Sequence, residues 1–105
     1  MALVYVDGRN VQRSQWPNLS DEELIERANA WADRHGHELV VIFDGDAPDG
    51  AVGTKGESAD DWLIREVPKH PGAWLVTSDR ALRAAAGSGA ARIVGGGSFL
   101  DELRK

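Results

Sequence analysis

The stretch Leu3-Val4-Tyr5-Val6-Asp7 is an apolar run that ends on an acidic residue, and the same pattern recurs at residues 39–44 and 74–79. Short runs rich in Val, Ile and Leu, followed by turn residues and a helical pattern, are typical of buried parallel strands. The carboxyl ends of parallel strands lie along one edge of a sheet, where open α/β sheets bind ligands. We therefore expect three carboxylates to converge at that edge: Asp7, Asp44 and Asp79.

The composition limits the class of protein. The chain has 105 residues, 42% hydrophobic and 28% charged, which is ordinary for a globular protein and predicts one domain over residues 1–105. Because there is no cysteine, disulfides and thiolate metal sites are excluded. We find neither an apolar run of membrane-spanning length nor a signal-peptide pattern, so we expect a cytoplasmic protein without a membrane partner. The net charge of -5 argues against bulk electrostatic coating of nucleic acid.

Helical patterns alternate with the strand patterns. Ser20-Asp21-Glu22-Glu23 is a capping box that opens a predicted helix, and Gly36 is a plausible stop. Further helices are predicted at about 58–67, at 81–86 and after a capping Ser98, whereas residues 8–19 are expected to form a polar loop. A short fourth strand is predicted at 92–94. This order predicts an α/β fold, with three α/β/α layers and a mainly parallel sheet of about four strands.

Further polar groups follow the strand ends. Asn10 comes three residues after Asp7, so we expect its amide to turn back toward that carboxylate, and Glu57, Asp60 and Asp61 cluster at a helix start. Oxygen ligands of this kind suit Mg²⁺ or Mn²⁺, which makes a divalent-metal site the leading hypothesis. Asp and Ser at a strand-to-helix turn are also favoured helix caps, so each residue taken singly has a purely structural interpretation.

Four segments, in order along almost the whole chain, resemble the NYN domains of the PIN-like nuclease superfamily, most closely its YacP-like branch. They are VDGRN at 6–10, VIFDG at 41–45, ESADD at 57–61 and LVTSD at 75–79. The resemblance implies a PIN-like, Rossmann-like topology and a Mg²⁺- or Mn²⁺-dependent ribonuclease, more specifically an endoribonuclease, that acts on RNA. By motif, Asp7, Asp60 and Asp79 match the family's metal-binding and catalytic aspartates. The matching supports are Asn10, Asp44 and Ser78, and Glu57 and Asp61 are weaker candidates for a second metal or for orienting water. Many PIN-like proteins have another acid shortly after the third aspartate, and this chain has none there.

An acidic chain must hold RNA through local cations. We expect Arg9, Lys55 and Arg80 to lie at the catalytic edge and Arg13 to extend that track. Among the aromatic residues, Trp31 and Trp74 are predicted to be core, while Trp16 and Trp62 are either core or base-stacking residues. His35 and His37 are predicted to lie on the surface.

Two other functions stay open. The apolar strand that ends in Asp44-Gly45-Asp46 resembles the nucleophile motif of haloacid-dehalogenase-type phosphatases, in which the first Asp is phosphorylated and the second is the acid/base. A non-catalytic RNA-binding domain of the same fold is the second alternative. Whether the protein also needs a ribosome or a protein partner, and its oligomeric state, are not determined by the sequence.

Overall fold

The computed structural model describes residues 1–105 and contains one sheet of five parallel strands. The strand order is β3-β2-β1-β4-β5. The bounds are Leu3–Asp7 for β1, Glu38–Phe43 for β2, Val52–Gly53 for β3, Trp74–Val76 for β4 and Arg92–Val94 for β5. The predicted α/β fold with a parallel sheet is confirmed. The sheet has one strand more than expected, because β3 is only two residues long and gives no periodic signal.

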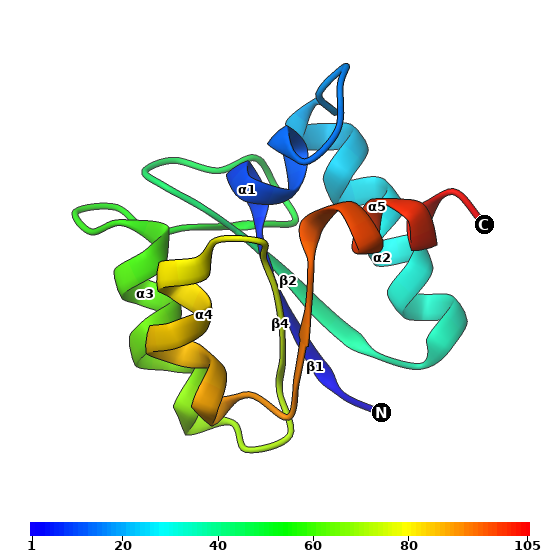
Figure 1. The fold of residues 1–105 in the computed structure, drawn as a ribbon. Coiled ribbons are helices and arrows are strands. Elements are labelled where there is room, and N and C mark those ends of the chain that lie inside the picture. The colour runs from blue at the N-terminus through cyan, green and yellow to red at the C-terminus, as the bar shows by residue number, and fades with distance from the viewer.

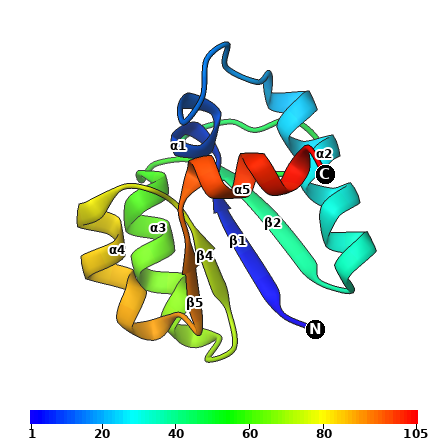
Figure 2. The same ribbon diagram turned by 45° about the vertical axis from the view of Figure 1, so that its right-hand side comes forward.

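Helices cover both faces of the sheet (Figures 1 and 2). Their bounds are Gly8–Arg13 for α1, Asp21–His35 for α2, Ala59–Glu66 for α3, Arg80–Ala86 for α4 and Gly96–Leu103 for α5, with 3₁₀ turns at Val67–Lys69 and Gly87–Gly89. Helices α3 and α4 lie on one face, and α2 and α5 lie on the other (Figure 1). The result is the predicted three-layer arrangement. None of the helices combines the length and the apolar character needed to span a membrane.

Alternation along the strands divides the core in two. In β1, Val4 and Val6 pack with α2 and α5, whereas Tyr5 between them packs with α3 and α4. All three side chains are buried, as expected for a central parallel strand that is covered on both faces. Because β1 is held by β2 and β4 on its two sides, its last residue, Asp7, is fixed at the centre of the sheet edge.

Two predicted boundaries were wrong. The expected polar loop at 8–19 begins with α1, a helix too short to show a clear period, whose Val11 and Gln12 are buried. The last helix begins at Gly96 with Gly95 as its N-cap, not at Ser98. A Cβ atom on Gly96 would lie 2.2 Å from the Ser14 hydroxyl, so α5 starts where its backbone packs closely against the end of α1.

The aromatic residues separate into three environments. Trp31 is buried and Trp74 is half-buried in the same core cluster, as predicted. His37 was predicted to be a surface residue, but it is half-buried, with its ring 4.8 Å from that of Trp74. His35 is exposed as predicted, although its ring lies 4.9 Å from that of Trp31. Trp62 packs edge-on against Tyr5, and Trp16 is 88% exposed.

Candidate active site

The carboxyl ends of the central strands border an open pocket of about 250 Å³. Nine residues from the ends of β1 and β2 and the starts of α1, α3 and α4 line it: Asp7, Arg9, Asn10, Arg13, Asp44, Ser58, Ala59, Asp60 and Asp79. The three strand-end aspartates therefore meet as the sequence predicts, and Asp60 of α3 joins them. Four carboxylates separated by most of the sequence share one pocket.

Asp7 lies at the base of this pocket and is only 5% exposed. The Thr77 hydroxyl donates a hydrogen bond of 2.9 Å to Oδ2 of Asp7 and accepts one of 3.1 Å from the backbone N–H of Asp79. Thr77 is itself fully buried, so it fixes both aspartates from behind. This role of Thr77 was not predicted, because the only signal in the sequence is a hydroxyl residue at the end of an otherwise apolar run.

Two of the pocket carboxylates, Asp7 and Asp60, have raised pKa values. Burial raises the pKa of Asp7 to about 6, and the nearby charges of Asp60, Asp79 and Asp44 add to this, while the Thr77 hydrogen bond opposes the rise. Burial also raises the pKa of Asp60, followed by the charges of Asp79 and Asp44. The pocket therefore concentrates negative charge, and none of its four carboxylates forms an ion pair with an arginine or lysine of the protein.

Two of the aspartates also have structural roles, and the one of Asp79 as a helix cap was predicted. Asp79 is the N-cap of α4, and its Oδ1 accepts a 3.0 Å hydrogen bond from the Leu82 N–H. Asp44 accepts a hydrogen bond from the Ala59 N–H and so connects the end of β2 to the start of α3. These bonds use one oxygen of each carboxylate and set the direction of the other.

Asn10 and Ser78 connect the surrounding segments. Asn10 was expected to turn its amide toward Asp7, but its Oδ1 instead accepts a 2.7 Å hydrogen bond from the Ser78 N–H. The Ser78 hydroxyl in turn accepts one of 2.8 Å from the Gly96 N–H. These two hydrogen bonds join α1, the β4–α4 turn and α5.

The remaining acidic candidates lie outside the pocket lining. Glu57 is paired with Arg65 at 2.6 Å, and hydrogen bonding to that guanidinium lowers the pKa of Glu57. Asp61 is exposed, and its backbone N–H donates to the capping hydroxyl of Ser58. Neither the Glu57 nor the Asp61 side chain therefore lines the pocket that holds the four carboxylates.

The candidate cations differ in their availability. Arg13 lines the pocket and is exposed, whereas Arg9 lines it but is held by Asp21 at 2.7 Å. Lys55 pairs with Asp46 at 3.7 Å, and neither Lys55 nor the exposed Arg80 contributes to the lining. Only the two arginines of α1 are therefore at the rim of the pocket.

The donor set of the pocket fits a hard divalent cation, because it consists of carboxylate and amide oxygens without thiol or imidazole groups. No three acidic or histidine side chains lie within ligating reach of one point. A cation that keeps several of its own water molecules suits such spacing, and this is the usual behaviour of protein-bound Mg²⁺.

Neither a protein-family model nor a curated protein sequence matches this chain. Solved structures that are similar to it include the following two. The W164L mutant of Rae1 (YacP) from Bacillus subtilis has a TM-score of 0.81 at 22% sequence identity, covering 99% of this chain and 76% of that one. A structure of Rae1 (YacP) from the same organism has a TM-score of 0.75 at 20% identity, covering 99% and 74%. These likenesses show that the chain has a YacP-like fold.

Proposed function

We propose that this protein is a metal-dependent ribonuclease of the NYN, PIN-like type and that the acidic pocket is its active site. The observation that carries the proposal is the convergence of four carboxylates in one open pocket, where none of them forms an ion pair with an arginine or lysine of the protein. The four segments that resemble NYN domains supply these carboxylates. The YacP-like fold supports a nuclease more than any other activity.

The proposed roles follow from position. Asp7, Asp60 and Asp79 would hold the metal, which when bound supplies a water of lowered pKa and shields charge on the phosphate. Asp44 stays anchored to α3 and adds negative charge beside them. Thr77 keeps Asp7 and Asp79 in place, and Arg13 contacts a phosphate of the bound strand from the rim.

The decisive experiment measures cleavage of a mixture of RNA substrates with Mn²⁺, with and without chelator. We expect chelator-sensitive cleavage that Asp79→Asn abolishes. Asparagine is also a good helix cap, so this variant keeps the hydrogen bond to α4 while it loses the charge. Asp46→Asn is the matched control, because the Asp46 side chain is 92% exposed and lies outside the pocket lining. It should cleave like the parent.

The same pair of variants tests the phosphatase alternative. That function needs Asp44 and Asp46 to act on one substrate, yet only Asp44 lines the pocket. Hydrolysis of a small phosphomonoester that is lost in Asp46→Asn, without RNA cleavage by the parent, would refute the ribonuclease proposal. RNA binding by the parent without cleavage under any metal would instead identify a non-catalytic RNA-binding domain.

A further inference from the structure

The connection between α1 and α2 carries an apolar side chain that the fold does not use. Trp16 is 88% exposed, although tryptophan is usually among the most buried residues of a protein. Its neighbours in sequence are Gln15, Pro17 and Asn18. A single exposed indole offers a flat aromatic face, and it does not form the extended apolar patch that marks a protein-docking surface.

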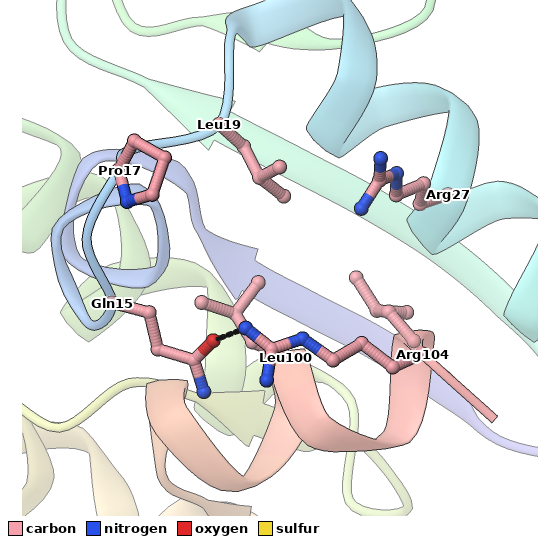
Figure 3. Close-up of a pocket in the computed structure, with 7 residues that line it drawn as sticks. Gln15, Pro17, Leu19, Arg27, Leu100 and Arg104 are labelled. Carbon is pink, nitrogen blue, oxygen red and sulfur yellow. Dashed lines mark hydrogen bonds between the residues drawn. The ribbon is translucent and has the colours of Figure 1, made fainter.

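The residues on both sides of Trp16 lie beside α5. The Gln15 amide donates a hydrogen bond of 3.1 Å to Asp101. Its oxygen accepts a hydrogen bond from Arg104, which Figure 3 shows as a dashed line. Pro17 borders a small cavity of about 40 Å³ together with Leu100 and other residues of α2 and α5 (Figure 3). The neighbours of Trp16 are thus anchored while the indole itself stays in solvent, and anchoring of the segment lowers the entropy cost of binding a ligand there.

A shallow groove connects this segment with the acidic pocket. It has a volume of about 320 Å³ and is lined by Arg9, Gln12, Arg13, Asn18, Leu19 and Asp21. Arg9 and Arg13 also line the acidic pocket, so the two cavities share a wall. Asn18 is two residues from Trp16, which places their Cα atoms no more than about 7 Å apart.

We propose that Trp16 is a base-stacking residue and that this groove guides an unpaired RNA strand between the acidic pocket and the indole. The inference rests on the proposed function, because the pocket is where the phosphodiester bond would be positioned. Arg13 would contact the backbone between the two ends, while the indole stacks on a base. Stacking needs an accessible base face, so the groove selects unpaired nucleotides and is indifferent to their identity.

The test measures binding of fluorescently labelled oligoadenylate with Ca²⁺ in place of Mg²⁺ and Mn²⁺, in order to limit cleavage. We expect Trp16→Ala to weaken binding roughly 5- to 150-fold, the range for loss of one stacked base, and Trp16→Phe to restore most of the affinity. Ile64→Ala is the matched control, because Ile64 is also an exposed large apolar residue but belongs to α3, away from the groove. It should bind like the parent.

An abasic ribose-phosphate oligomer separates stacking from backbone contacts. Trp16→Ala should bind it as the parent does, and quenching of tryptophan fluorescence by oligoadenylate should be smaller in Trp16→Phe than in the parent. Equal oligoadenylate affinity of Trp16→Ala and the parent would overturn the inference even if both cleave RNA. Binding that depends on Trp16 without cleavage by the parent would refute the ribonuclease proposal and leave the stacking site intact.

Discussion

The two ends of the sheet differ in the side chains that they bring together: like-charged carboxylates at one end and packed aromatic rings at the other. At the carboxyl ends of the strands, four aspartates face one open pocket. At the amino ends, Trp31, His37 and Trp74 pack around a cavity of about 150 Å³, with ring centroids 5.5 Å apart for Trp31 and His37 and 4.8 Å for His37 and Trp74. There the Arg92 guanidinium lies 4.8 Å from the Trp74 ring, so its charge has a favourable partner.

The aromatic residues at the amino ends therefore stabilise the fold, and the aspartates at the carboxyl ends destabilise it. Aromatic contacts at the amino ends stabilise the native state, whereas the like charges at the carboxyl ends raise its free energy. Stability therefore explains the aromatic cluster but not the acidic one. Residues that oppose folding are characteristic of functional sites.

Trp31→Ala should produce the largest change in stability. Removing a buried indole from the aromatic end is expected to cost about 3–5 kcal/mol of unfolding free energy. Trp31→Phe should cost much less, because the indole Nε1 is buried without a hydrogen-bond partner and phenylalanine removes that unmet donor. Urea unfolding of both variants measures this, and equal losses would show that the indole N–H has a partner in solution.

Asp7→Asn should increase the free energy of unfolding, whereas the tryptophan variants decrease it. Without metal and above about pH 6, the variant is expected to be more stable than the parent, by on the order of 1–3 kcal/mol, since one of four like charges is removed from a buried position. Mn²⁺ should raise the melting temperature of the parent by mass action, and chelator should reverse this. The variant should lose most of this response, and an equal Mn²⁺ response would rule out Asp7 as a ligand.

The unfolding free energy of the metal-free protein should depend on pH, because burying the charged form of Asp7 is unfavourable. Because the pKa of Asp7 rises from 3.8 unfolded to about 6 folded, the native state binds more protons between these values. The contribution of Asp7 to stability is therefore fully present below about pH 4 and is lost as the pH rises through 6. Subtracting the profile of Asp7→Asn removes the contributions of other groups. A flat difference between pH 4 and 7 would contradict the raised pKa.

The smallest expected effect is a change in the salt dependence of RNA binding when single arginines at the acidic or the aromatic end of the sheet are replaced. Arg13→Ala should flatten the dependence of RNA binding on salt by about 0.7 of a unit for one lost phosphate contact. Arg9→Ala should change it less, because Asp21 already pairs with Arg9. Arg92→Ala removes an exposed arginine at the aromatic end and should leave the slope unchanged. A slope altered only by Arg92→Ala would place the RNA at the other end of the molecule.

The local sequence pattern was sufficient to predict most of the helices and strands, and also that Asp7, Asp44 and Asp79 converge at one edge of the sheet. Apolar runs that end on Asp7, Asp44 and Asp79 predicted parallel strands, and parallel strands necessarily bring their carboxyl ends to one edge. The Ser20 cap and the Gly36 stop of α2 also followed from the sequence, because capping depends on residues a few positions apart.

Only the tertiary structure decided the partner of each polar group. Thr77 contacts Asp7 across 70 residues, and Asn10 turns to Ser78 across 68, away from the neighbouring carboxylate. The burial of His37 and the exposure of Trp16 likewise depend on which segments pack against them. The physical reason is that periodicity and capping are encoded over a few residues, whereas a hydrogen-bond partner or a neighbouring ring is chosen by the packing of distant segments.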